Sequence, residues 1–69
     1  MPSTVIRRFA YDAPARALDV EFVSGRRYRY RDVPAEVAGE FAAAFSKGRY
    51  FNARIRDRFG HVVLPVRPE

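Results

Sequence analysis

Two adjacent segments of the chain alternate between apolar and polar residues, and this pattern predicts a β-hairpin. From Ala17 to Phe22 an apolar side chain recurs at every second position. The same period returns in residues 26–31, where Tyr28 and Tyr30 alternate with arginines. Because successive side chains of a strand point to opposite faces, each segment has one apolar face and one charged face.

The loop between the two segments sets their register. Directly opposed residues of an antiparallel pair lie on the same face of the sheet, so the apolar sides match only across a loop with an odd number of residues. Val23, Ser24 and Gly25 form such a loop, with Gly25 in the left-handed conformation that a type I turn with a G1 bulge requires. The predicted pairs are Leu18 with Tyr30, Val20 with Tyr28, Asp19 with Arg29 and Glu21 with Arg27.

A further strand is predicted before the hairpin. Residues Thr4 to Tyr11 are rich in β-forming side chains, although Arg7 and Arg8 interrupt their alternation. Pro14, within residues 12–15, indicates a turn between this strand and the hairpin, since proline cannot donate to a strand ladder. We expect the charged face of the sheet to be open to water; it carries Asp19, Glu21, Arg27 and Arg29.

Two helices are predicted downstream. The first starts near Pro34, whose fixed φ suits a first helical turn, and it ends before Gly48, a residue suited to the C′ position. Its apolar stripe consists of Val37, Phe41, Ala44 and Phe45. The second, shorter helix extends from about Arg49 to Arg58. Its apolar face consists of Phe51, Ile55 and Phe59, which recur every four residues.

The segment from His61 to Val66 is short and apolar, and it is either a closing edge strand or a tail laid over the core. Residues 67–69 are expected to fray. The predicted fold class is thus α+β: a three-stranded antiparallel β-meander with one main helix and a second short helix packed on one face. The 69 residues form one domain with its core between about residues 4 and 59.

The composition indicates how the fold is stabilised and which classes of protein are excluded. The chain contains no cysteine, which excludes disulfides and thiolate zinc sites as sources of stability. Six Phe and four Tyr supply a hydrophobic core instead. No charged and apolar leader pattern opens the sequence, and no apolar run approaches the roughly 20 residues of a transmembrane helix. We therefore expect a soluble cytoplasmic protein that makes no membrane contact.

The side chains that carry catalysis are scattered or lack partners. The single histidine, His61, lies beside an apolar run, where an incidental residue is more frequent than a general base or a ligand. The serines have no obvious base, and the four glycines make no phosphate-cradling loop. We predict that the protein is not an enzyme and has no metal site, cofactor or small-molecule substrate.

Positive charge is the main chemical signal in the sequence. The net charge is +5, which favours an acidic partner such as nucleic acid. A GC-rich genome equally accounts for arginine in place of lysine, but not for the excess of positive charge. The predicted nucleic-acid-binding residues are Lys47, Arg49, Tyr50, Asn52, Arg54, Arg56 and Arg58. A secondary candidate surface consists of Arg27, Arg29 and Arg31.

Several of these residues have an alternative role. Tyr50 is the predicted stacking ring, because it lies off the apolar face of the second helix. Asn52 is expected to be half-buried, where it would either contact the partner or bond backbone at a helix junction. Arg27 and Arg29 of the secondary surface are opposite Glu21 and Asp19, so pairing across the hairpin is the alternative for the sheet arginines.

An ordered set of short motifs resembles the KTSC domain. The motifs are Tyr11-Asp12, Leu18-x-Val20-x-Phe22-x-Ser24-Gly25, Tyr28-x-Tyr30 followed by Val33-Pro34, and Ser46-x-Gly48-x-Tyr50-Phe51-Asn52-x-x-Ile55-Arg56. The resemblance extends from Thr4 to Phe59. The sequence departs from it at Phe45, where a smaller residue is expected, and in the tail at 62–64.

The resemblance implies a family whose function is not established. The domain is named for its occurrence at the C-terminus of some lysyl-tRNA synthetases, and it also occurs in free-standing short bacterial and phage proteins. Attachment to a synthetase suggests RNA binding by association, and no family catalytic residue exists to carry over. RNA binding is therefore the first hypothesis. The alternative is a protein-interaction or dimerisation module that uses the edge strands or the apolar segment 62–66.

Overall fold

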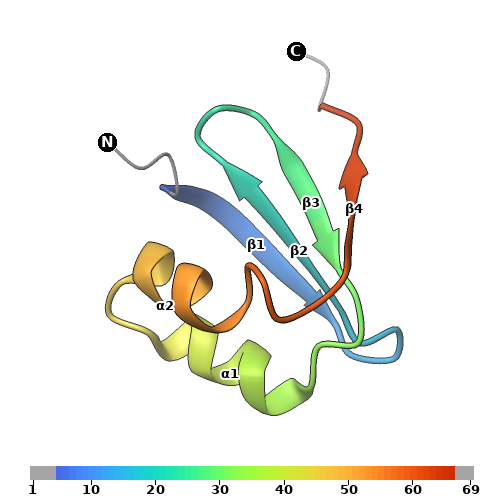
Figure 1. Cartoon of the computed structure of the whole chain (residues 1–69), viewed down its shortest axis with the longest axis vertical. Coiled ribbons are helices and arrows are strands. Elements are labelled where there is room, and N and C mark those ends of the chain that lie inside the picture. Colours follow the sequence, from blue (N-terminus) through green and yellow to red (C-terminus); the bar gives the residue numbers. More distant parts are fainter. Residues whose placement is uncertain (1–4, 67–69) are drawn as a thin grey trace.

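Four antiparallel strands form one sheet in sequence order, and two helices lie on one of its faces (Figure 1). The computed structural model describes residues 5–66. Its elements are β1 (Ile6–Asp12), β2 (Ala17–Phe22), β3 (Arg27–Tyr30), α1 (Ala35–Ala43), α2 (Lys47–Arg54) and β4 (His61–Leu64). The α+β class is confirmed. The predicted strand start at Thr4 and the predicted frayed end at 67–69 lie outside the described residues.

The β2–β3 hairpin has the predicted register. Leu18 pairs with Tyr30, Asp19 with Arg29, Val20 with Tyr28 and Glu21 with Arg27. In the connecting loop Gly25 has a φ of +95°, and its N–H donates to the carbonyl of Phe22 at 2.9 Å. A side chain at this position would be strained, so the glycine fixes the odd-length loop and with it the register.

β1 pairs with β2 in an irregular register that accounts for its two adjacent arginines. Ile6 pairs with Phe22 and Arg8 pairs with Glu21, so Arg7 is the extra residue of a β-bulge. A bulge sets two residues of one strand against one residue of the partner strand. Arg7 and Arg8 therefore both lie near Glu21.

The segment after the helices forms a fourth strand, so the prediction of a three-stranded sheet is wrong in its strand number. β4 pairs antiparallel with β3, with His61 opposite Tyr30 and Val63 opposite Tyr28. Of the two alternatives for this segment, the closing edge strand is confirmed. Its partner precedes both helices in the chain, so the pairing is non-local, and a strand this short carries no clear periodicity.

α1 is shorter than predicted and ends at Ala43. Phe41 is buried in the core as expected, but Ala44 is extended and the side chain of Phe45 is fully exposed. The ring of Tyr50, and not that of Phe45, packs beside Phe41, with 6.1 Å between the two ring centroids. The prediction that Ala44 and Phe45 complete the apolar stripe is therefore wrong.

α2 starts and ends earlier than predicted. Ser46 is its N-cap, and the Ser46 hydroxyl accepts a hydrogen bond from the Arg49 N–H at 3.3 Å. Such a cap starts a new helix, so Gly48 lies inside α2 and is not the C′ residue of α1. Residues 55–58 form turns after the helix, although Phe51 and Ile55 are buried as predicted.

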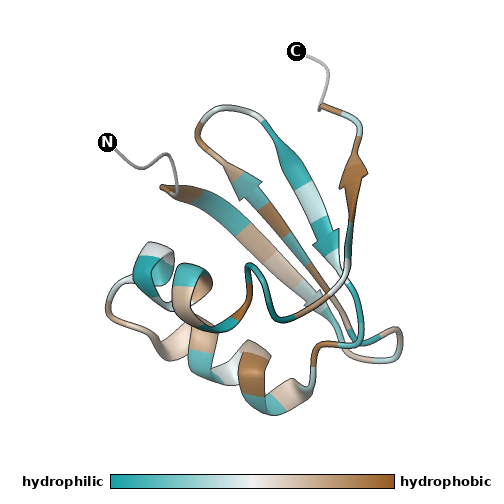
Figure 2. Ribbon diagram, viewed as in Figure 1, coloured by the Kyte–Doolittle hydropathy of each residue, from teal (hydrophilic) through white to brown (hydrophobic). Residues whose placement is uncertain are grey.

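The core lies between the helices and the apolar face of the sheet. Phe41 of α1 packs edge-on against Phe9 of β1, with 4.7 Å between ring centroids. Phe51 of α2 packs in the same way against Phe22 of β2, at 5.3 Å. The core cluster comprises Leu18, Val20, Phe22, Tyr30, Val33, Phe41, Phe51 and Ile55. β4 lies at the far edge of the sheet and is largely hydrophobic (Figure 2). Its Val63 remains 69% exposed.

Candidate nucleic-acid interface

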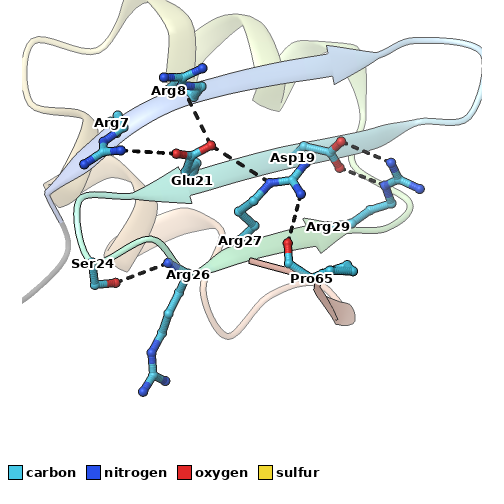
Figure 3. A network of polar contacts seen from close by, with 9 residues as sticks. All are labelled: Arg7, Arg8, Asp19, Glu21, Ser24, Arg26, Arg27, Arg29 and Pro65. Carbon is cyan, nitrogen blue, oxygen red and sulfur yellow. Dashed lines mark hydrogen bonds and ion pairs between the residues drawn. The ribbon is translucent and has the colours of Figure 1, made fainter. Parts of the chain in front are cut away.

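The charged face of the sheet holds a buried carboxylate surrounded by arginines (Figure 3). The Glu21 side chain is only 6% exposed, and nitrogens of Arg7, Arg8 and Arg27 lie 3.6, 3.7 and 3.9 Å from its oxygens. The expectation that Glu21 is open to water is therefore wrong. The bulge in β1 explains the difference, because it sets two arginines over Glu21 where regular pairing would set one.

Arg7 and Arg8 are members of this network that sequence reasoning missed. The signal was present as the break in the alternation of the first strand. An extra residue in a pattern of period two is what a bulge produces. With that interpretation both arginines fall on the charged face, and three guanidinium groups share one carboxylate.

Two side chains of the secondary candidate surface are engaged within the fold. Arg29 donates two hydrogen bonds to Asp19, at 2.8 and 3.1 Å, and this contact raises the pKa of the Arg29 guanidinium above its ordinary value. Arg27 donates to the carbonyl of Pro65 at 3.0 Å in addition to its place in the network. Arg31 lies just after the end of β3 and is exposed.

Lys47 and Arg49 lie in the first turn of α2, which contains no acidic residue. Positive charge at a helix N-terminus opposes the helix dipole, so these two charges do not stabilise the helix. Lys47 donates from Nζ to the carbonyl of Ala44 at 2.9 Å. Arg49 is exposed, and its side chain makes no ion pair within residues 5–66. The charge of Arg49 therefore has no evident role in the fold.

Tyr50 connects α2 to α1. Its hydroxyl donates a 2.6 Å hydrogen bond to Glu40, and its ring packs against Phe41. Burial first, and the bond to Glu40 second, raise the pKa of Tyr50 above its ordinary value. The Arg54 guanidinium lies 5.8 Å from the ring centroid, within the range of a cation–π contact. The fold thus uses both the ring and the hydroxyl of the predicted stacking residue.

The remaining candidates lie in and after the C-terminal half of α2. Asn52 is exposed, so the expectation of a half-buried side chain is wrong, and its amide oxygen accepts from Arg56 at 3.4 Å. Arg56 also acts on a core residue. Burial first, and neighbouring Tyr28 second, raise the pKa of Tyr30, and the positive charge of Arg56 opposes this rise. Arg58 is exposed and makes no side-chain ion pair in the described part of the chain.

The predicted cations surround α2 and do not converge on one point. Lys47 and Arg49 lie at its start, Arg54 at its end, and Arg56 and Arg58 in the turns after it. Within residues 5–66 the only ion pair of this set joins Arg54 to Glu40, at 3.9 Å. From residue 41 to residue 56 the sequence has no Asp or Glu. Such an arrangement suits several successive phosphates of a nucleic-acid backbone.

No three His, Asp or Glu side chains within residues 5–66 lie together as the ligands of a metal ion would. No helix among these residues is long and apolar enough to cross a membrane.

The family model of the KTSC domain matches residues 2–59 of the chain. The chain belongs to the KTSC domain family. A crystal structure of a KTSC domain protein from Yersinia pestis has the same fold, with a TM-score of 0.86 and 31% sequence identity. The similarity covers 94% of this chain and 92% of that one. The resemblance carried by the short motifs is thereby confirmed.

KTSC relatives include two different kinds of protein. An uncharacterized protein of Stutzerimonas stutzeri is 44% identical over 52 residues, which cover 75% of this chain and 73% of that protein. A lysine–tRNA ligase of Nostoc punctiforme is 39% identical over 56 residues, which cover 81% of this chain but only 10% of the ligase. The KTSC domain is thus most of one protein and a small part of the other, and the ligase name describes the larger protein.

Proposed function

We propose that this KTSC domain is a non-catalytic nucleic-acid-binding module, with RNA as its partner and the surface around α2 as the contact. The observation that carries the proposal is a difference in pairing among the cations. Arg49 and Arg58 are exposed without an ion pair in residues 5–66, whereas the arginines of the charged sheet face lie beside carboxylates. Cations that the fold does not neutralise are available to a polyanion.

The chemistry of arginine fits this partner. The guanidinium fork presents paired donors that match phosphate oxygens, and each contact with a phosphate releases condensed counterions. The net charge of +5 adds a long-range attraction of the same sign. Binding driven by these terms is sequence-tolerant and depends strongly on salt.

The relatives support RNA over other polyanions. A segment 39% identical to this chain forms part of a lysine–tRNA ligase, whose name places it with an RNA substrate. This support comes from the association of the two domains in one chain. It is independent of the positive charge of the chain, and both favour a nucleic-acid partner.

Titration of labelled single-stranded RNA at low and moderate salt tests the proposal. We expect weak binding at low salt that declines as salt rises. The variant R49Q/R56Q/R58Q removes three cations and should reduce the slope of log affinity against log salt by about 2. R26Q is the control for R49Q, since Arg26 is also exposed but extends away from the sheet network on the hairpin loop (Figure 3).

Four outcomes would overturn parts of the proposal. Absence of binding at low salt, or affinity that ignores salt, would exclude phosphate-driven binding. Equal losses in R49Q and R26Q would exclude α2 as the contact. A single-stranded DNA of the same sequence that binds as tightly as the RNA would exclude a preference for RNA, because the two differ only in the 2′-hydroxyl and in the methyl group of thymine.

A second candidate function is protein interaction or dimerisation through β4. β4 is an edge strand without a charged Lys, Arg, Asp or Glu, and Val62 and Val63 are exposed on it. The opposite edge, β1, carries the bulge and arginines that protect natural sheet edges from pairing. Sedimentation of the wild type and V63K tests the candidate: a dimer that V63K dissociates supports it, and monomers in both exclude dimerisation through this edge.

A further inference from the structure

Phe45 is an aromatic residue that the fold does not use. It lies between the end of α1 and the Ser46 cap of α2, and its side chain is 106% exposed. A phenylalanine ring contributes to stability by leaving water, so a ring in this position contributes almost nothing. Its exposure is also larger than that of any other large hydrophobic residue found exposed within residues 5–66.

An intramolecular contact is within reach of Phe45 but is not made. Phe45 precedes the N-cap of α2, and Tyr50 occupies the fourth position of that helix. A hydrophobic residue before the cap often packs on this fourth residue and fixes the entry of the chain into the helix. Here Tyr50 turns to Phe41 and Glu40 instead, and the Phe45 ring is left in solvent.

The backbone on both sides of Phe45 is held in place. The Ala44 N–H donates to the carbonyl of Phe41 at 3.2 Å, and the Ser46 hydroxyl caps α2. Lys47 reaches back to the carbonyl of Ala44, which places its ammonium group beside the residue before Phe45. The exposed ring thus lies on a connection whose two ends are hydrogen-bonded, and the Lys47 ammonium group lies beside Ala44.

The sequence that follows Phe45 is cationic. Lys47 and Arg49 follow two and four positions later, and no carboxylate occurs from residue 41 to residue 56. Single-stranded nucleic acids bind where basic residues contact the phosphates and an aromatic ring stacks on an unpaired base. A duplex keeps its bases stacked inside and cannot use such a ring in the same way.

We infer that Phe45 is the base-stacking residue of the α2 surface, and that the surface is built for single-stranded rather than double-stranded RNA. The inference rests on the proposed function and replaces Tyr50, whose ring and hydroxyl are engaged with α1, as the stacking ring. Lys47 and Arg49 would contact the phosphates that flank the stacked base.

The test compares F45A with V23A, a control that shortens another exposed apolar side chain, on the loop between β2 and β3. We expect F45A to weaken binding of single-stranded RNA about 5- to 150-fold, the range for loss of one stacked base. V23A should bind as the wild type does. Denaturant unfolding of F45A should match that of the wild type, because the ring is not packed.

A third variant reports on the stacking itself. The chain contains no tryptophan, so F45W introduces a single indole at the proposed site. F45W should retain affinity, and its fluorescence should be quenched by single-stranded RNA but not by the same RNA annealed to its complement.

The outcomes separate this inference from the proposed function. If the wild type does not bind RNA, the proposed function fails and the inference fails with it. If the wild type binds and F45A binds equally well, only the role of Phe45 is overturned. Equal losses of F45A on single strand and duplex would exclude base stacking. Salt-dependent binding to anionic phosphatidylserine vesicles that F45A abolishes, without loss on RNA, would assign the ring to a membrane surface instead.

Discussion

The two basic surfaces of this KTSC domain, the charged sheet face and the surface around α2, both carry arginines but differ in how these arginines are paired with carboxylates. On the charged sheet face, four arginines lie 2.8 to 3.9 Å from the oxygens of Asp19 or Glu21. Around α2, Arg49 and Arg58 make no ion pair among residues 5–66. The difference teaches that clustering of arginine in a sequence does not locate a binding surface, because pairing decides which charges are available.

Removal of the shared carboxylate should have the largest effect on stability. Glu21→Ala leaves three arginines without their common partner, and we expect it to lower the free energy of unfolding by about 2 kcal/mol. The loss is smaller than for a fully buried cluster because the arginines are partly solvated. Urea unfolding measures it. Glu36→Ala, on the exposed first turn of α1, is the control and should cost less than about 1 kcal/mol. Equal midpoint shifts in the two variants would contradict the role given to Glu21.

The second largest effect on stability is expected at Tyr50. It tests whether this residue stabilises the fold or contacts RNA. Tyr50→Phe removes the hydroxyl that donates to Glu40 and keeps the ring against Phe41. We expect a loss of about 1 kcal/mol in the free energy of unfolding, with RNA affinity little changed. A variant of full stability but reduced affinity would return Tyr50 to the binding surface.

The stability of the protein at alkaline pH should also depend on the hydrogen bond between Tyr50 and Glu40. Burial and the bond to Glu40 raise the pKa of Tyr50, and burial raises the pKa of Tyr30, so the folded state holds both protons more strongly than the unfolded state does. Their contribution is complete below the unfolded value of about 10 and is lost as pH rises through the folded values. Stability of the wild type should therefore fall above about pH 10. Tyr50→Phe should fall less steeply, and parallel curves would contradict the shift at Tyr50.

The smallest effect on stability is expected for the unpaired cations. R49Q and R58Q should each change the free energy of unfolding by less than about 0.5 kcal/mol, as surface substitutions without partners do. R27Q removes the same charge but loses contacts to Glu21 and the Pro65 carbonyl, and it should cost about 1 kcal/mol. Indistinguishable unfolding curves for R27Q and R49Q would remove the distinction between the two surfaces.

The central hairpin could be predicted because its determinants are local. Alternation fixed the faces of β2 and β3, and Gly25 fixed an odd-length loop, so the register followed. The burial of Glu21 could not be predicted in the same way. It depends on a bulge in another strand, which brings Arg7 and Arg8 over the carboxylate.

The boundary between the helices shows where local signals compete. Gly48 favoured the end of a helix and Ser46 favoured the start of one, and the two signals lie two residues apart. Packing decides between them, because Tyr50 takes the place beside Phe41. This boundary also decides the make-up of the candidate site. The predicted cations lie on and after α2, whereas Phe45, which was predicted in the core, lies on the surface.

The salt dependence of RNA binding by two charge-matched variants tests the central claim most directly. R49Q/R58Q and R27Q/R29Q each remove two positive charges, the first pair from the α2 surface and the second from the sheet face. If the unpaired cations make the contact, R49Q/R58Q reduces the slope of log affinity against log salt by about 1.4, and R27Q/R29Q leaves it close to the wild-type value. Equal reductions in both variants, or a reduction confined to R27Q/R29Q, would contradict the account.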